Sequence, residues 1–291
     1  SLMKPIEEHR VHKRGEPTRS DLAYRKLQYN LSEIEHRYGK KVHILSDPFL
    51  LSHLAQLCSV KTIQPTINQL VETLYANLVK IIINNEFPRK LQTVVTRMSE
   101  SHPHEATFEA ELVDTEQSAV SVNLARAGTF PSHICYNALN YALNPNRVRQ
   151  DHISINRATD AKDRVVGVNV AGHKIGGSVN DSIVLFPDPM GATGSTIISA
   201  LDIYKNHLSG GPALKYIAVH LIVTPEYLRA VTAKYPDLNI YAVRLDRGLS
   251  APDIFETIPG SRWSEERGLN DKQYIVPGGG GFGEILNNAF V

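Results

Sequence analysis

One segment of the sequence combines a carboxylate, a loop of small residues and the start of an amphipathic stretch. The apolar run 183–186 is followed by Asp188, and the loop 191–196 leads directly into residues 196–207, whose spacing predicts a helix. Glycines in the loop allow the backbone to approach a ligand closely. Hydroxyl groups and the free N–H groups at the start of the helix would face the same point. This arrangement suits a bound phosphate dianion.

The loop is not of the nucleotide-binding type that contains a lysine, because no lysine follows its second glycine, Gly194. A structural alternative stays open at this point. The same residues would also make an ordinary turn between a strand and a helix, with Ser195 or Thr196 as the N-cap. We favour phosphate binding over the simple turn.

The elements around this loop alternate in type. Five short apolar runs predict strands, and residues 196–207 and 225–235 between the last three have helical spacing. This order is typical of an α/β protein with a mostly parallel sheet flanked by helices. Such sheets bind ligands beyond the carboxyl ends of their strands, where Asp188 is expected. The predicted strands are residues 119–122, 152–155, 183–186, 216–223 and 240–243.

The N-terminal part of the chain differs from the rest. Residues 1–40 carry many charges of both signs and predict an extension outside the core, while residues 41–291 predict the α/β domain. Within the extension, residues 21–38 predict a helix, and a partly disordered tail is the alternative. Thr66–Glu86 has the apolar spacing of a helix with one buried face.

The composition excludes several classes of protein. A formal net charge of +1 over 291 residues argues against a protein that coats nucleic acid. Two cysteines, Cys58 and Cys135, exclude a disulfide scaffold and a cysteine zinc cluster. No apolar run approaches the roughly 20 residues of a membrane span, and residues 1–20 do not resemble a signal peptide. We therefore expect a cytoplasmic globular protein without membrane contact.

Residues 188–196, which read Asp-Pro-Met-Gly-Ala-Thr-Gly-Ser-Thr, resemble the loop with which the uracil phosphoribosyltransferase family binds phosphoribosyl pyrophosphate (PRPP). The opening Asp-Pro-Met is its most specific feature. The resemblance covers roughly residues 41–290. Further segments resemble the family in the same order: Leu-Ala-Arg-Ala-Gly at 124–128, His-Ile-Ser-Ile-Asn-Arg at 152–157, Lys174, and Tyr-Ile-Val-Pro-Gly at 274–278.

The resemblance implies the phosphoribosyltransferase fold and the transfer of phosphoribose from PRPP to uracil, giving UMP and pyrophosphate. It also implies Mg²⁺ held mainly by PRPP, and a homodimer or a larger homo-oligomer. Asp188 and Arg126 are the implied catalytic residues. The implied PRPP-binding residues are Arg126, Arg157, Asp188, Pro189, Met190, Gly191, Ala192, Thr193, Gly194, Ser195 and Thr196, and the implied base-binding residues are Ile275, Gly280, Gly281 and Phe282.

The base-binding loop also departs from the family pattern. Gly281 stands where the family has an aspartate that serves the sugar and pyrophosphate, and Phe282 stands where it has a small alanine. Glu284 keeps the second family acid in a longer form. Residues 247–266 form an insertion, and we favour a surface excursion over a lid for it.

These departures leave three functions open. The favoured one is uracil phosphoribosyltransferase. Gly281 favours a regulatory protein that binds PRPP or a nucleotide without useful turnover, because a carboxylate is missing. Phe282 favours a phosphoribosyltransferase for another nucleobase, because it adds bulk beside the base.

Overall fold

The computed structural model describes residues 21–159 and 165–290. These residues form two compact units. The smaller unit consists of residues 21–30 and of Asn84–Asp114, and the remaining described residues form the larger unit. All residues that the sequence predicts for ligand binding belong to the larger unit.

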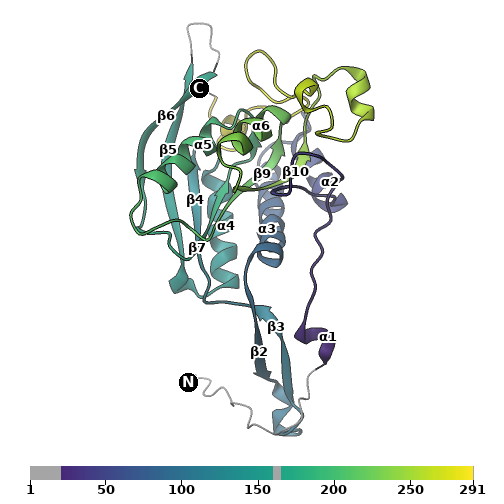
Figure 1. Cartoon of the computed structure of the whole chain (residues 1–291), viewed down its shortest axis with the longest axis vertical. Helices are drawn as coiled ribbons and strands as arrows, with labels where there is room; N and C mark the ends of the chain where they lie inside the picture. Colours follow the sequence, from purple (N-terminus) through teal and green to yellow (C-terminus); the bar gives the residue numbers. More distant parts are fainter. Residues whose placement is uncertain (1–20, 160–164, 291) are drawn as a thin grey trace. The chain divides into compact units, whose positions relative to one another are not determined.

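An eight-stranded sheet forms the centre of the larger unit (Figure 1). Its strands follow the order β1-β10-β9-β7-β4-β5-β6, and the short β8 pairs with β9. Neighbouring strands are parallel except β5 and β6, which are antiparallel. The strands are β1 (Val42–Ile44), β4 (Ser118–Ala125), β5 (Val148–Thr159), β6 (Val165–Lys174), β7 (Ser182–Pro187), β8 (Met190–Gly191), β9 (Lys215–Val223) and β10 (Asn239–Leu245).

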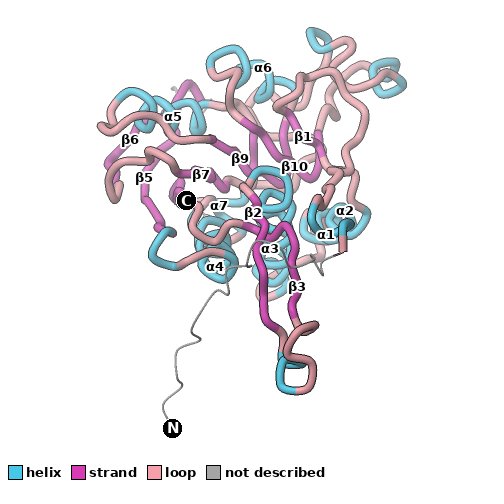
Figure 2. The backbone as a smooth tube through the Cα atoms, turned by 60° about the horizontal axis from the view of Figure 1, so that its bottom comes forward, coloured by secondary structure: helices cyan, strands magenta, loops and turns pink. Residues whose placement is uncertain are grey.

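Helices cover both faces of this sheet, and Figure 2 shows α5 and α6 on one side and α3 and α4 on the other. Burial on both faces explains the apolar sequence of the central strands. Every residue of β7 is buried, and so is every residue of β9 after the first. The helices are α2 (Pro48–Leu57), α3 (Thr66–Glu86), α4 (Thr129–Ala142), α5 (Ser195–Asn206), α6 (Pro225–Lys234) and α7 (Phe282–Ile285), with 3-10 segments at Pro145–Arg147, Pro252–Glu256 and Trp263–Glu265.

This architecture confirms the predicted α/β fold with a mostly parallel sheet. All five predicted strands are present, each somewhat longer than the apolar run that predicted it. The predicted helices over 66–86, 196–207 and 225–235 correspond to α3, α5 and α6. The strand β6, which pairs antiparallel with β5, was not predicted.

The chain changes direction across the sheet between β4 and β7. From β4 it passes through α4 to β5 on one side, and from β7 it passes through α5 to β9 on the other. The carboxyl ends of β4 and β7 therefore leave a crevice between two loops that run apart. In parallel sheets this switch point is the usual place of the ligand.

The smaller unit contains an antiparallel hairpin of β2 (Arg89–Val95) and β3 (Thr107–Val113), a 3-10 segment at Arg97–Glu100, and α1 (Leu22–Arg25). The rings of Tyr24 and Phe108 meet edge to face, with centroids 5.7 Å apart. Large apolar side chains stand exposed on this hairpin, at Leu91, Val94, Val95 and Met98. The sequence analysis did not predict the hairpin.

The helix predicted for residues 21–38 is wrong beyond its first turn. Only Leu22–Arg25 is helical. The later residues bond to the chain around β1 instead: Ser46 N–H donates to Ser32 O at 2.9 Å, and Ile34 N–H to Ile44 O at 3.0 Å. The expectation that residues 1–40 lie outside the core is also wrong for Tyr38, which is 4% exposed and belongs to the core cluster. Residues 1–20 lie outside the described residues.

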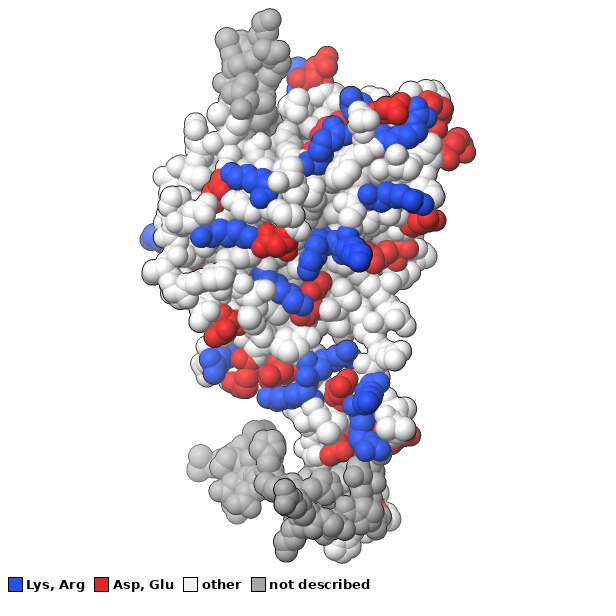
Figure 3. Space-filling view, in the orientation of Figure 1, with Lys and Arg blue, Asp and Glu red and all other residues white. Residues whose placement is uncertain are grey.

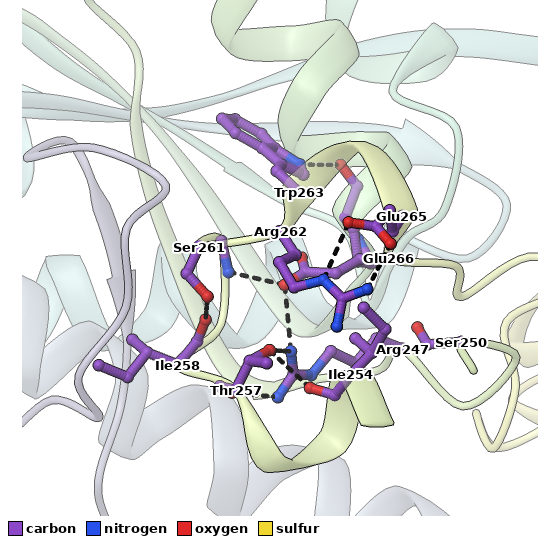
Figure 4. Close-up of polar contacts among 12 residues, drawn as sticks. Arg247, Ser250, Ile254, Thr257, Ile258, Ser261, Arg262, Trp263, Glu265 and Glu266 are labelled. Carbon is purple, nitrogen blue, oxygen red and sulfur yellow. Dashed lines mark hydrogen bonds and ion pairs between the residues drawn. The ribbon is translucent and has the colours of Figure 1, made fainter. Parts of the chain in front are cut away.

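The insertion at 247–266 is an ordered excursion built around a buried ion pair (Figure 4). Arg247 Nη1 lies 3.0 Å from Glu266 Oε1, and the same oxygen accepts from Gly260 N–H at 2.8 Å. The hydroxyl of Tyr38 donates to Glu266 as well. Trp263 Nε1–H donates to the carbonyl of Pro225 at 2.9 Å, which attaches the excursion to α6.

The charged side chains of the described residues are mixed on the face drawn in Figure 3, where blue and red groups alternate. This distribution follows the balance of 31 Lys and Arg against 30 Asp and Glu in the whole sequence. Among the helices of the described residues, none has the length and apolarity that crossing a membrane requires.

Candidate active site

A cavity of about 550 Å³ lies at the carboxyl ends of β4 and β7. We call it the switch-point cavity. It is bounded by the segment after β4, the loop that starts α5, and the C-terminal segment from Gln273 to Glu284. Its walls include Arg126, Asp188, Met190, Ala192, Thr193, Gly194, Thr196, Tyr227, Gln273, Tyr274, Ile275, Gly280, Gly281, Phe282 and Glu284.

The backbone of Asp188 is fixed from below by a buried pair that the sequence analysis missed. His220 Nδ1 lies 2.6 Å from the carbonyl oxygen of Asp188, and its Nε2 lies near the hydroxyl of Tyr227, at 2.5 Å. A carbonyl only accepts, so Nδ1 carries the proton and donates to Asp188. Nε2 then accepts from the hydroxyl of Tyr227. A histidine within the otherwise apolar strand β9 was the available sequence signal.

Burial keeps this pair in its neutral form. It lowers the pKa of His220 to about 4, although the hydrogen bond to the Asp188 carbonyl acts in the opposite direction. Burial also raises the pKa of Tyr227 well above its usual value, and the nearby charge of Asp188 raises it further. The imidazole therefore positions Asp188 as a neutral hydrogen-bond donor.

The low pKa of His220 predicts a loss of stability in acid. The folded state binds this proton only near pH 4, whereas the unfolded chain binds it near pH 6.5. Its stabilisation is thus complete above pH 6.5 and falls with pH below that, by at most about 1.4 kcal/mol per pH unit. Urea unfolding between pH 7 and pH 4 should show a flatter profile for His220→Asn than for the unchanged chain. Identical slopes would contradict the assignment.

Two glycines allow the loop before α5 to take its shape. Gly194 has φ +88°, and a Cβ there would lie 2.7 Å from Val231 Cγ2. A Cβ on Gly191 would lie 2.9 Å from Val223 Cγ1. The hydroxyl of Thr224 donates to the carbonyl of Ala192 at 2.7 Å. The loop therefore packs against β9 and α6, and it has no room for side chains at positions 191 and 194.

The structure corrects the N-cap predicted for the simple turn. Gly194 is the N-cap and has no side chain, and Thr193 Oγ1 accepts from the first helix N–H, that of Ser195, at 3.3 Å. Thr193 Oγ1 also lies 2.9 Å from Ser195 Oγ. Neither Ser195 nor Thr196 is the N-cap. The first N–H groups of the helix stand beside the cavity wall formed by Thr193, Gly194 and Thr196.

Arg126 follows β4 and reaches across the cavity to the C-terminal segment. Its Nη2 lies 3.1 Å from Glu284 Oε1, and its Nη1 donates to the carbonyl of Ala289 at 3.2 Å. The side chain of Arg126 is 37% exposed and that of Glu284 is 28% exposed. This ion pair joins residues 158 positions apart, so spacing in the sequence gave no sign of it.

The glycine-rich segment is fixed at its beginning by another pair that the sequence analysis missed. Arg244 Nη2 donates to the carbonyl of Gly278 at 2.9 Å, and Asp246 Oδ2 accepts from Gly278 N–H at 2.7 Å. Arg244 and Asp246 are bonded to each other through two nitrogen–oxygen contacts of 2.6 and 2.7 Å. Arg and Asp two residues apart at the end of β10 thus bind both backbone groups of one glycine.

Phe282 lines the switch-point cavity, and its ring is almost fully covered by surrounding residues. Its side chain is 3% exposed, and a Cβ on Gly279 would lie 2.9 Å from its Cε2. The ring packs beneath the glycine-rich segment, next to the thiol of Cys58, which lies 2.8 Å from the same Cβ position. Phe282 therefore supports the wall from below.

The carboxylate of Glu284 lies where a side chain at position 281 would be. A Cβ built on Gly281 comes within 2.2 Å of Glu284 Oε2. The carboxylate that the family pattern places at 281 has a counterpart in space, three residues later in the chain.

Not every predicted residue reaches the cavity. Pro189, Gly191 and Ser195 belong to the loop but do not line the cavity. Lys174, at the end of β6, lies opposite His152 in the strand register and does not line the cavity either. Arg157 lies opposite Val168 in the register of β5 and β6, and its side chain lies outside the described part of the structure. None of residues 247–266 lines the cavity, which favours a surface excursion over a lid.

The mostly parallel sheet thus has a glycine-containing loop at its switch point, and Arg126 and Asp188 line the cavity beside that loop. The family described as uracil phosphoribosyltransferase matches residues 44–261. The chain belongs to this family of pentosyltransferases.

Comparison with individual proteins adds two relatives. A uracil phosphoribosyltransferase from Thermosipho africanus (strain TCF52B) is 39% identical over 106 residues, which span 36% of this chain and 39% of that protein. The solved structure of the AQ2163 protein from Aquifex aeolicus is similar with a TM-score of 0.64 at 22% identity. That similarity covers 86% of this chain and 99% of the other, and it shows a shared fold.

Proposed function

We propose that the chain transfers the phosphoribosyl group of PRPP to uracil, giving UMP and pyrophosphate. One observation carries the proposal. The loop at the start of α5, Asp188, Arg126 and the glycine-rich segment all line the same cavity. The reaction needs these four parts together, because the sugar phosphate, the ribose, the leaving group and the base must be held in line.

We assign the 5′-phosphate to the loop Ala192–Thr196, where backbone N–H groups and hydroxyls gather at a helix start. Asp188 would accept hydrogen bonds from the ribose hydroxyls and stabilise positive charge at the anomeric carbon. Arg126 and Arg157 would bind the pyrophosphate. In the reaction the bond from the anomeric carbon to the pyrophosphate oxygen breaks, and its electron pair leaves with pyrophosphate. The anomeric carbon forms a bond to N1 of uracil, and the N1 proton passes to water or to the released pyrophosphate.

We propose that Mg²⁺ in the cavity would be held mainly by the substrate. Asp188 and Glu284 are the acidic side chains among the described lining residues, and they would supply a minority of its ligands. PRPP oxygens and water would supply the remaining ligands of Mg²⁺. Bound there, Mg²⁺ would neutralise charge on the pyrophosphate.

The base would lie against the C-terminal wall of the cavity. Ile275 is 8% exposed, and Gly280 and Gly281 present backbone without side chains. Backbone N–H and C=O groups suit the edge of a flat ring. Phe282 lines the same wall, so a phosphoribosyltransferase for another nucleobase stays the alternative.

A second candidate is a protein that binds PRPP or a nucleotide without useful turnover. It is favoured by the contacts of Arg126 to Glu284 and Ala289, which occupy the guanidinium that would bind the pyrophosphate. This candidate requires the same cavity and differs only in the chemical step.

One experiment separates these functions. The protein is mixed with Mg²⁺ and PRPP, and pyrophosphate release is measured for uracil and for a panel of other nucleobases. Release that depends on uracil supports the first proposal. PRPP binding by calorimetry without release for any base supports the second, and absence of PRPP binding contradicts both.

We also propose that the protein assembles at least into a homodimer. The exposed apolar side chains of the β2–β3 hairpin support this, because a group of exposed apolar side chains marks an interaction surface. We expect a dimer or larger species by sedimentation at micromolar concentration, and Val95→Lys with Met98→Lys should shift it towards monomer. A single monomeric species of the unchanged chain would contradict the proposal.

A further inference from the structure

Gln273 occupies an unusual backbone conformation on the wall of the switch-point cavity. It belongs to a tight turn in which Asn270 Oδ1 accepts from the N–H groups of Lys272 and Tyr274, both at 3.0 Å. Gln273 N–H donates to Asn270 O at 2.9 Å. The turn leaves Gln273 with φ +66°.

This conformation is unfavourable for glutamine. The left-handed region is open to glycine, and among other residues it is enriched in asparagine and aspartate, whose short side chains bond locally. The other two described non-glycine residues with positive φ are Asp181 and Asn288, which are of these tolerated types. Of the three, only Gln273 lines the cavity. Backbone strain of this kind persists where the residue serves a site.

The side chain of Gln273 also has unused bonding capacity. Among the described residues its carboxamide makes no hydrogen bond, although the side chains around it in the turn are bonded. A carboxamide offers two N–H donors and one carbonyl acceptor in one plane. This set matches an adjacent N–H and C=O pair on the edge of a heterocyclic base.

We propose that Gln273 determines base specificity, its carboxamide forming hydrogen bonds with the edge of the nucleobase in the switch-point cavity. Gly280 and Gly281, on the same C-terminal wall, would leave the space for that base. The inference rests on the proposed function in one respect, that the ligand is a nucleotide. It adds a side chain where the family resemblance assigned only Ile275, Gly280, Gly281 and Phe282.

The test compares the binding of UMP and ribose 5-phosphate by calorimetry, because the ratio of their Kd values isolates the base. Gln273→Met removes the amide at nearly constant size, and Gln273→Gly removes it while relieving the backbone. Both should weaken UMP binding by roughly 3- to 30-fold and leave ribose 5-phosphate unchanged. Gln273→Gly should also raise Tm by about 1–3 °C.

Asp181→Gly is the matched control, because it relieves a φ of +59° outside the cavity. It should raise Tm by less than Gln273→Gly does, because aspartate tolerates this region, and it should leave both Kd values unchanged. Unchanged UMP binding in Gln273→Met overturns the inference, and so does UMP binding no tighter than that of ribose 5-phosphate in the unchanged chain. Neither readout needs turnover. A protein that binds UMP through Gln273 but releases no pyrophosphate would therefore contradict the proposed enzyme and support this inference.

Discussion

Thr193→Glu is expected to weaken PRPP binding by at least about 100-fold, the equivalent of roughly 2.7 kcal/mol. The side chain of Thr193 stands on the cavity wall at the start of α5, where we place the 5′-phosphate dianion. A carboxylate there repels the phosphate and takes up the helix N–H groups that would bind it. Binding is measured by calorimetry in the presence of Mg²⁺.

Thr193→Gln provides the matched control, because it has the shape of glutamate without the charge. It should cost only a few-fold in Kd, from the lost hydroxyl contact. Thermal unfolding checks that both variants fold like the unchanged chain. Equal losses for the two variants would assign the effect to shape, and PRPP binding unchanged in both would mean that the loop binds no phosphate.

Glu284→Gln is expected to reduce PRPP binding and uracil turnover by about 10- to 100-fold, because it removes a charge-assisted contact worth roughly 1.5–3 kcal/mol. The structure explains why we expect weaker PRPP binding in this variant. The carboxylate of Glu284 lies where a side chain at 281 would be, and it orients Arg126. We therefore expect Glu284 to supply the carboxylate that Gly281 lacks.

Gly281→Asp alone should not improve PRPP binding, because its Cβ would come within 2.2 Å of Glu284 Oε2 and bring two carboxylates together. Gly281→Asp combined with Glu284→Ala should recover part of the PRPP binding that substitution of Glu284 removes, because the introduced aspartate then supplies a carboxylate in place of Glu284. Tighter PRPP binding in Glu284→Gln would contradict this account. Glu284 would then compete with PRPP for Arg126, and the protein without useful turnover would become the better description.

Five strands of the central sheet were predictable because each contains a short apolar run, which burial on both faces of the sheet explains. Residues 183–186 and 216–223 carry this signal most strongly. The hairpin β2–β3 was not predictable in the same way. Its strand Arg89–Val95 mixes charged, polar and apolar residues, and none of its seven residues is buried. The helix predicted for residues 26–38 does not form, because backbone hydrogen bonds to the chain near β1 outweigh the helical preference of these residues.

The residues of the candidate site also differ in how far the sequence predicted them. Asp188 and its loop are contiguous in sequence, so their pattern was visible. The groups that support them come from distant positions: His220 beneath Asp188, and Glu284 beside Arg126. Contacts of this kind depend on the folded chain and leave no local pattern. Gln273 was not predicted as a site residue. Glutamine rarely has a positive φ, so the sequence gives no sign of this backbone conformation.

Arg244 and Asp246 hold the backbone of Gly278, and this affects how the C-terminal wall of the switch-point cavity can change over evolution. Both backbone groups of that glycine are held by side chains rooted at the end of β10, outside the glycine-rich segment itself. The backbone position of Gly278 therefore does not depend on the side chains of the segment. The start of the segment stays in place whichever residues stand later in it. Ligand preference at this wall can thus drift while the scaffold stays in place.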